Sequence, residues 1–188
     1  MQPQIWNIST RPDQAKTAAI AQQVGLRPLV VELLLQRGFE EAEEITDFLH
    51  PRLKDLSDPF LMPDMRPAVD RIFQAIDQQE KVVLYGDYDV DGVTSITLLH
   101  GFLREFGLES HTFLPHRMDE GYGLNEHGIE RCLTEFEPSL LIAVDCGTSS
   151  IAQVDFLNEK GIDVLIFDHH ESNSGEKPAA VAVVTPKM

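Results

Sequence analysis

The stretch Lys81-Val-Val-Leu-Tyr-Gly-Asp-Tyr-Asp-Val-Asp-Gly92 indicates how this chain folds. It begins with an apolar run typical of a buried strand, and a helical pattern follows it. Three aspartates stand at alternate positions between the two, Asp87, Asp89 and Asp91. Carboxylates this close together repel each other unless a cation neutralises them. The stretch therefore predicts a site for a hard metal ion at the exit of a buried strand.

Two other interpretations of the three aspartates are weaker. Acidic residues are favoured at the start of a helix, but capping accounts for one aspartate and not for three. An EF-hand calcium loop uses similar spacing, yet it needs a preceding helix and a bidentate acid at its twelfth position. Here a strand precedes, and the twelfth position counted from Asp87 is Leu98.

The hydrophobic pattern beyond residue 80 alternates between extended and helical periods. It predicts strands over residues 81–85, 109–114, 140–144, 162–167 and 180–184. It predicts helices over residues 92–106, 125–136 and 149–160, the second capped by Asn125. Such alternation is typical of an α/β domain with a parallel sheet and helices on both faces.

The chain before this region is punctuated and helical. Apolar stripes run through residues 29–34, 42–49 and 69–76, and several prolines interrupt the segment between the last two. We therefore predict a helical segment and connector over residues 1–78. An α/β domain, incomplete at its C-terminus, follows over residues 79–188.

The predicted strands end in polar motifs. Two of them are followed by Asp87 and by Asp145, and a third by Asp168-His169-His170. A fourth leads into Pro115-His-Arg117. Because parallel strands end at one edge of the sheet, where ligands bind, we expect these motifs to meet in space.

The Asp168-His169-His170 string narrows the choice of metal. Imidazole binds transition metals well, and carboxylates suit Mn²⁺ and Mg²⁺. A mixed site favours Mn²⁺, with Mg²⁺ or Co²⁺ as alternatives. Neighbouring side chains on an extended segment point to opposite sides, so one histidine would bind metal while the other faces substrate or packs. The amides of 147–150 could also hold an anion at a helix start.

Composition excludes several classes of protein. The chain has 15 basic and 31 acidic residues, a formal charge of −16, which argues against a basic nucleic-acid footprint. Two cysteines do not make a disulfide framework, and we expect both Cys132 and Cys146 to be packing residues. The N-terminus lacks a signal-peptide pattern, and no apolar run is long enough to span a membrane. We therefore expect a cytoplasmic location.

Taken together, these strings resemble the DHH phosphoesterase family, whose defining motif stands here as Asp168-His169-His170. The strings 85–92, 144–147, 115–117 and 120–124 resemble more narrowly its single-strand-specific 5′→3′ DNA exonucleases, enzymes of DNA repair and recombination. The resemblance spans nearly the whole chain.

The resemblance also implies roles for individual residues. The metal-binding residues would be Asp87, Asp89, Asp91, Asp145 and His169, with Asp87 either a ligand or an acid behind the ligands. His170 would lie beside the scissile phosphate, and Asp168 would orient a neighbouring imidazole. Arg117 would contact phosphate. The complete enzyme would use two ions and act on single-stranded DNA.

One departure from the family pattern leaves alternatives open. The family has a further metal-binding aspartate downstream and a second domain, and nothing here matches either. We therefore expect an N-terminal portion with little or no exonuclease activity alone. Relatives that hydrolyse short oligonucleotides, cyclic dinucleotides or pyrophosphate usually have histidine where this chain has Tyr85. A non-catalytic module that binds replication or repair proteins is the other alternative.

Overall fold

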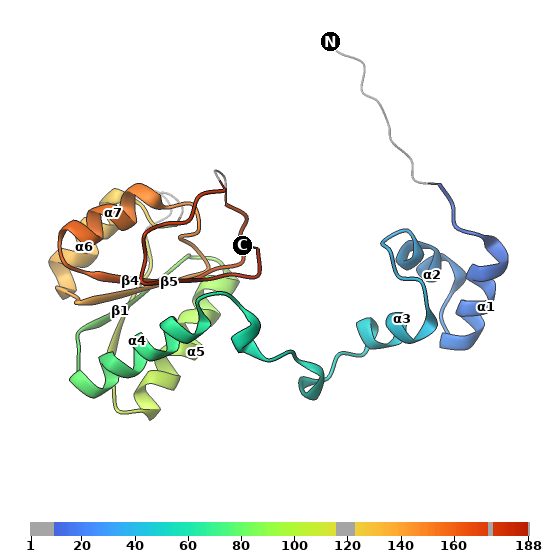
Figure 1. The fold of residues 1–188 in the computed structure, drawn as a ribbon, viewed down its shortest axis with the longest axis horizontal. Coiled ribbons are helices and arrows are strands. Elements are labelled where there is room, and N and C mark those ends of the chain that lie inside the picture. The colour runs from blue at the N-terminus through green and yellow to red at the C-terminus, as the bar shows by residue number, and fades with distance from the viewer. Residues whose placement is uncertain (1–9, 116–122, 173–174, 188) are drawn as a thin grey trace, which may run out of the picture. The chain divides into compact units, whose positions relative to one another are not determined.

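The computed structural model describes residues 10–115, 123–172 and 175–187 (Figure 1). The chain forms two compact units, Met1–Ser57 and Asp58–Met188. This boundary differs from the one predicted at residues 78 and 79. The reason is that helix α4 (Met65–Gln78) contributes Ala68 and Ala75 to a core that it shares with the strands. Its apolar face therefore belongs to the α/β unit.

A five-stranded sheet forms the centre of the larger unit. Its strands, in their order across the sheet, are β2 (Ser110–Phe113), β1 (Val82–Gly86), β3 (Leu140–Val144), β4 (Asp163–Phe167) and β5 (Ala182–Val184). Every neighbouring pair is parallel. The predicted α/β class is confirmed. The strand order, which hydrophobic periodicity does not encode, changes direction between β1 and β3.

Helices cover both faces of the sheet (Figure 1). They are α4, α5 (Val90–Glu105), α6 (Glu126–Phe136) and α7 (Ile151–Glu159). Val83 and Tyr85 of β1 join the core formed with α6 and α7, whereas Val82 and Leu84 join the core formed with α4 and α5. Both faces of β1 are buried, which explains its unbroken apolar sequence.

Local capping explains where two of these helices begin. α5 begins at Val90, two residues earlier than predicted, because the side chain of Asp89 caps it. Asn125 caps α6 as predicted, and its Oδ1 accepts the N–H of Gly128 at 2.8 Å. Both caps lie at the edge of the sheet where the strands end.

The N-terminal unit is a small helical body. Its helices are α1 (Gln14–Val24), α2 (Pro28–Leu35) and α3 (Ala42–Leu49), followed by the 3-10 turn η1 (Leu53–Asp55); a second such turn, η2 (Pro59–Leu61), opens the larger unit. Within α2, Val31 and Leu34 are buried, whereas Leu29 and Leu33 of the predicted stripe are exposed. α2 is apolar on nearly every side, so its periodicity does not identify the buried face.

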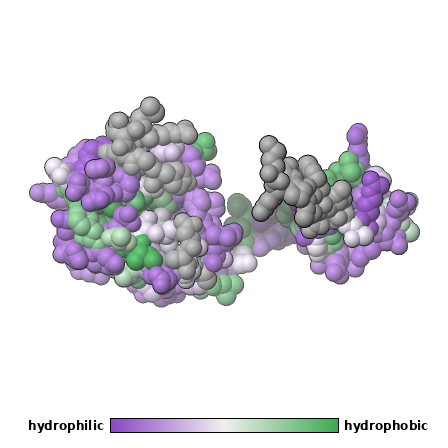
Figure 2. Space-filling view, turned by 90° about the horizontal axis from the view of Figure 1, so that it is seen from above, coloured by the Kyte–Doolittle hydropathy of each residue, from purple (hydrophilic) through white to green (hydrophobic). Residues whose placement is uncertain are grey.

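Polar side chains cover much of the surface seen in Figure 2, with apolar patches between them. Among the described residues, no single helix is both long and apolar enough to cross a membrane. α1 and α2 reach that length and composition only as a pair, and they are bent by 115° at the break between them.

Candidate metal centre

Acidic and imidazole side chains gather beyond the carboxyl ends of three neighbouring strands. Asp87 follows β1, Asp145 follows β3, and Asp168 follows β4. β1 and β3 are the pair at which the strand order changes direction, and open α/β sheets bind ligands at that position.

Asp87 is the fully buried aspartate of this group. Its carboxylate is completely buried; Oδ1 accepts the N–H of Tyr88 at 2.7 Å, and Oδ2 has no hydrogen-bond partner among the described residues. The first turn of α5 passes so close that a Cβ atom at position 92 would lie 2.3 Å from the carbonyl oxygen of Asp87. Gly92 is therefore required by this close approach.

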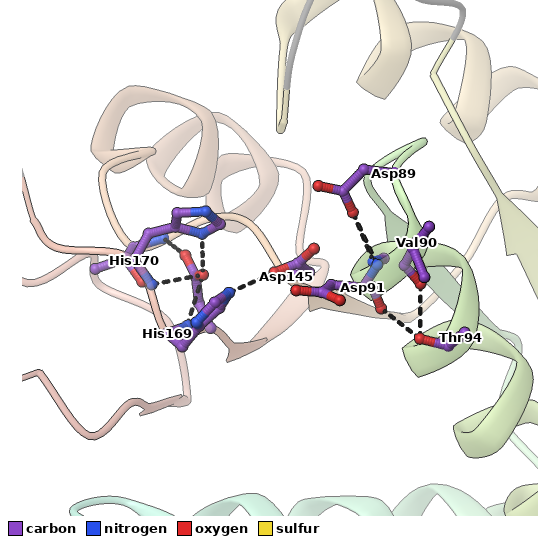
Figure 3. A network of polar contacts seen from close by, with 10 residues as sticks. Asp89, Val90, Asp91, Thr94, Asp145, His169 and His170 are labelled. Carbon is purple, nitrogen blue, oxygen red and sulfur yellow. Dashed lines mark hydrogen bonds and ion pairs between the residues drawn. The ribbon is translucent and has the colours of Figure 1, made fainter. Parts of the chain in front are cut away.

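Asp89 accounts for the capping role that one of the three aspartates was expected to fill. Its Oδ1 accepts the N–H of Asp91 at 3.0 Å and that of Gly92 at 3.1 Å (Figure 3). The hydrogen bond from Gly92 is the main cause that lowers the pKa of the Asp89 carboxyl. Asp91 lies in the first turn of α5 with an exposed side chain.

Asp145 joins β3 to the histidines that follow β4. Its backbone has a φ of 59°, a left-handed conformation that aspartate tolerates better than most residues. Its Oδ1 lies 3.0 Å from Nε2 of His169 (Figure 3), and its buried Oδ2 has no hydrogen-bond partner among the described residues. Burial, followed by repulsion from Asp89, raises the pKa of the Asp145 carboxyl.

Asp168 holds the segment that carries both histidines. Its Oδ1 accepts the backbone N–H of His169 at 2.8 Å and that of His170 at 3.1 Å. The same oxygen lies 2.7 Å from Nδ1 of His170, and Oδ2 accepts the N–H of Thr148 at 3.0 Å. Burial acts to raise the pKa of Asp168, but the hydrogen bonds from Thr148 and His170 outweigh it and lower that pKa. In turn, the hydrogen bond to Asp168 raises the pKa of His170.

These residues fit a divalent cation. One ligand atom from each of Asp145, His169 and His170 lies within 4.8 Å of the others. The unpartnered buried oxygens of Asp87 and Asp145 add carboxylate oxygens that no described side chain bonds. A buried carboxylate oxygen without a partner is costly, and a bound cation removes that cost. The mixture of carboxylates and imidazoles suits Mn²⁺.

Two hollows meet at this group of side chains. The first, of about 450 Å³, is lined by Asp91, Asp145, Asp168 and His169 together with Met62, Met65, Thr94, Ser95, Phe167, Val184 and Pro186. The second, of about 390 Å³, is lined by Asp168 and His170 together with Gly123, Leu124, Cys146, Gly147, Thr148, Ser149, Ser150 and Glu171. The two imidazoles therefore line different hollows, although their ring centroids are only 4.7 Å apart.

The structure engages part of the turn over residues 147–150, whose amides were predicted as a possible site for an anion. The N–H of Thr148 donates to Asp168, and the N–H of Ser150 donates to the carbonyl of Gly147. Two of the four amides are thus occupied within the chain. Asp168 therefore occupies one of the amides that were expected to face an anion.

Other expectations have mixed outcomes. Arg117, predicted to contact phosphate, lies outside the described residues. Cys132 and Cys146 are buried as expected, and burial raises the pKa of both thiols. Sequence reasoning missed Met62, Met65 and Phe167, which line the first hollow. No local pattern marks the two methionines, since only the packing of α4 brings them to the sheet edge.

A family model, the DHH family N-terminal domain, matches residues 81–188. The chain belongs to the DHH family. The match begins just before β1 and extends through β5, so it includes every strand-end motif described above. The resemblance predicted from the motifs is confirmed.

Known DHH proteins that resemble this chain are considerably longer. The chain is 44% identical over 183 residues to the single-stranded-DNA-specific exonuclease RecJ of Bacillus subtilis (strain 168). The aligned residues make up 97% of this chain and 23% of that protein. The crystal structure of RecJ from Thermus thermophilus in complex with Mn²⁺ matches with a TM-score of 0.67 and 26% identity, over 96% of this chain and 24% of that one. A crystal structure of exonuclease RecJ bound to manganese matches with a TM-score of 0.63 and 30% identity, over 70% of this chain and 33% of that one.

Proposed function

We propose that this chain supplies the metal-binding part of a phosphodiesterase that removes nucleotides from the 5′ end of single-stranded DNA. The observation that carries the proposal is the convergence of Asp89, Asp145 and His169 at one sheet edge. The 44% identity to a single-stranded-DNA-specific exonuclease supports the substrate class. Because the chain spans 23% of that relative, we assign the exonuclease activity to a longer protein and expect little from residues 1–188 alone.

The metal would be held by Asp89, Asp91, Asp145 and His169, with Asp87 bonded behind them or as a further ligand. Two related proteins were solved with manganese, which favours Mn²⁺. When bound, such cations lower the pKa of a water molecule from about 15.7 toward neutrality and neutralise charge on a phosphate. The chain has a formal charge of −16, so bound cations would also supply the positive charge that a phosphate backbone needs.

His170 would act on the scissile phosphate. A carboxylate only accepts hydrogen bonds, so the contact with Asp168 places a proton on Nδ1 of His170 and fixes the ring. The raised pKa keeps the second proton on Nε2 to higher pH. From Nε2 the imidazole would donate to an oxygen of the phosphate while Asp168 holds the opposite side of the ring.

Hydrolysis of cyclic dinucleotides or short oligonucleotides is the weaker proposal. Tyr85 stands where those relatives usually have a histidine, and its side chain packs in the core with Phe113. In a longer protein that contains this chain, we expect faster cleavage of 5′-phosphorylated single-stranded DNA than of a cyclic dinucleotide. The reverse order of rates would favour the weaker proposal.

The proposed metal site is tested by calorimetry with Mn²⁺. We expect Asp89→Ala and His169→Ala each to weaken binding by about 10-fold or more, as expected for residues that hold or orient a metal. Asp155→Ala is the matched control, since Asp155 is an exposed carboxylate on α7 that lines neither hollow. Equal Mn²⁺ affinity in all four proteins would refute the assignment.

A further inference from the structure

Tyr85 connects the acidic motif to the segment before α6. It lies in β1, two residues before Asp87, and its ring stacks on Phe113 with centroids 5.1 Å apart. Its buried hydroxyl donates to the carbonyl of Gly123 at 3.1 Å. Nδ2 of Asn125 lies 3.4 Å from that hydroxyl and donates to the same carbonyl at 3.1 Å. A hydroxyl buried in an apolar core is costly unless it is bonded, so these contacts hold the segment against β1.

Helix α6 is built around this hydroxyl. A Cβ atom at Gly128 would lie 2.4 Å from the phenolic oxygen of Tyr85. Glycine in a helix costs about 1 kcal/mol relative to alanine, so its presence here makes room for the phenol. The contact is therefore a specific feature of this core, because a helix packed on phenylalanine would not need glycine at that position.

The segment that Tyr85 holds is one wall of the second hollow. Gly123 and Leu124 line that hollow together with His170. On their other side they approach the turn that follows Asp145: a Cβ atom at Gly147 would lie 3.3 Å from Cδ1 of Leu124. The wall is thus fixed between the ends of β1 and β3, which carry Asp87 and Asp145.

We propose that Tyr85 is a positioning residue for the substrate, whose hydroxyl sets the wall of the hollow that receives a nucleotide unit beside His170. This inference rests on the proposed function. The volume of about 390 Å³ is in the range of small-molecule sites. Leu124 and Cys146 line the hollow with apolar atoms that suit a base, and Ser149, Ser150 and His170 line it with polar groups that suit a sugar phosphate. The carboxylates of Asp168 and Glu171 also line it, so the phosphate would lie at the His170 imidazole. Tyr85 bears no metal ligand role in this arrangement.

The test uses thymidine 5′-monophosphate as the probe and the Mg²⁺-loaded chain, followed by NMR titration, with Mn²⁺ affinity measured separately by calorimetry. We expect Tyr85→Phe to weaken binding of the probe by about 3- to 10-fold, the effect of losing one hydrogen bond. Mn²⁺ affinity should stay the same. Asn125→Ser keeps an oxygen that can cap α6 but loses Nδ2, so it should weaken binding of the probe by a similar factor.

Cys132→Ala is the control for a general loss of stability. Cys132 lies on α6 in the same core, is completely buried, and lines neither hollow. We expect this variant to unfold at a lower temperature than the unsubstituted chain and to bind the probe with unchanged affinity. If Cys132→Ala weakened binding of the probe as much as Tyr85→Phe does, the positioning role would be overturned.

Other results separate this inference from the proposed function. Unchanged binding of the probe by Tyr85→Phe would overturn the inference alone. NMR chemical-shift changes confined to Thr94 and Ser95 of the first hollow would overturn it too. So would the absence of probe binding at concentrations up to about 10 mM in a chain that binds Mn²⁺. Absence of Mn²⁺ binding by the unsubstituted chain would refute the proposed function, and the inference would fall with it.

Discussion

Nε2 of His169 lies 3.0 Å from Oδ1 of Asp145, and the two residues belong to the ends of neighbouring parallel strands. The contact joins the Asp-His-His string to an aspartate that lies 24 positions before His169. Parallel pairing of β3 with β4 brings the two together, and the backbone N–H of Asp145 donates to the carbonyl of Phe167 at 2.9 Å to hold the turn. Sheet topology therefore determines which of these side chains meet.

Replacing Asp168 should change the titration of His170. In Asp168→Asn the carboxylate that raises the pKa of His170 is lost, so that pKa should fall toward its ordinary value. NMR titration of the imidazole protons measures the shift. In the unsubstituted protein the raised pKa of His170 stabilises the fold at acidic pH as long as Asp168 stays ionised, and this contribution is lost as pH rises through that pKa. Asp155→Asn should leave the titration of His170 unchanged; an equal shift in that control would contradict the assignment.

Replacing Asp145 with asparagine should abolish Mn²⁺ binding and stabilise the metal-free protein. Its folded-state pKa is raised, so the folded protein holds that proton more tightly, and stability from this group is lost as pH rises through the raised pKa. We expect Asp145→Asn without metal to be more stable than the unsubstituted protein at pH 7, with the difference shrinking toward low pH.

Thermal unfolding measured with and without Mn²⁺ tests both effects of the Asp145→Asn substitution. Mn²⁺ should raise the unfolding temperature of the unsubstituted chain and leave that of Asp145→Asn unchanged, because a ligand stabilises only the state that binds it. A metal-free Asp145→Asn that is less stable than the unsubstituted protein at pH 7 would show that the carboxylate is not strained by burial.

The parts of the fold that sequence predicts well are those governed by local pattern. Strand β3, residues 140–144, was predicted with the bounds that the structure has, because both of its faces are buried and its apolar run is continuous. The buried face of α2 was not, since that helix is apolar on most sides. The assignment of α4 to the N-terminal segment differs from the structure because packing against β5, and not periodicity, determines its place.

The same division applies to the candidate site. Parallel strands end at one edge, so the meeting of Asp87, Asp145 and Asp168 follows from the fold class. Which groups touch depends on strand order and on turns of unusual geometry, such as the left-handed backbone at Asp145. That is why the occupation of the Thr148 amide by Asp168 could not be predicted from the string of residues alone.

At the opposite end of the strands, Arg71 should prove essential for stability but not for metal binding. Its guanidinium contacts Glu80 at 2.8 Å and Asp163 at 2.6 Å, and its side chain is almost fully buried. Breaking a buried ion pair costs about 3–5 kcal/mol, and the half-exposed Asp163 reduces this to about 2–3 kcal/mol for Arg71→Met. Urea denaturation measures the loss.

The pH dependence of that loss has a definite sign. The hydrogen bond from Arg71 lowers the pKa of Glu80, so its stabilisation is present above the unfolded-state pKa and is lost as pH falls. The difference between Arg71→Met and the unsubstituted protein should therefore shrink in acid. Arg104→Met, at an exposed arginine of α5, should change stability by less than about 0.5 kcal/mol at any pH. Mn²⁺ affinity that falls in Arg71→Met at a temperature where it is folded would show coupling between the two ends of the sheet.

Two glycines of the same helix should respond in opposite ways to alanine. A Cβ atom at Gly92 would lie 2.3 Å from the backbone oxygen of Asp87, so Gly92→Ala must push the start of α5 away from β1. A Cβ atom at Gly101 has no heavy atom within 4 Å, so Gly101→Ala should stabilise the helix by about 0.5–1 kcal/mol. For Gly92→Ala we expect a loss of about 1–3 kcal/mol, the usual cost of overpacking.

Metal binding distinguishes the two variants more sharply than stability does. Displacing α5 moves Asp89 and Asp91 away from Asp145, so Mn²⁺ affinity should fall by about 10-fold or more in Gly92→Ala, as it does when residues around a metal are disturbed. It should be unchanged in Gly101→Ala. Full Mn²⁺ affinity in a folded Gly92→Ala would mean that the aspartates of α5 do not hold the cation, and the ligands would then have to come from the ends of β3 and β4 alone.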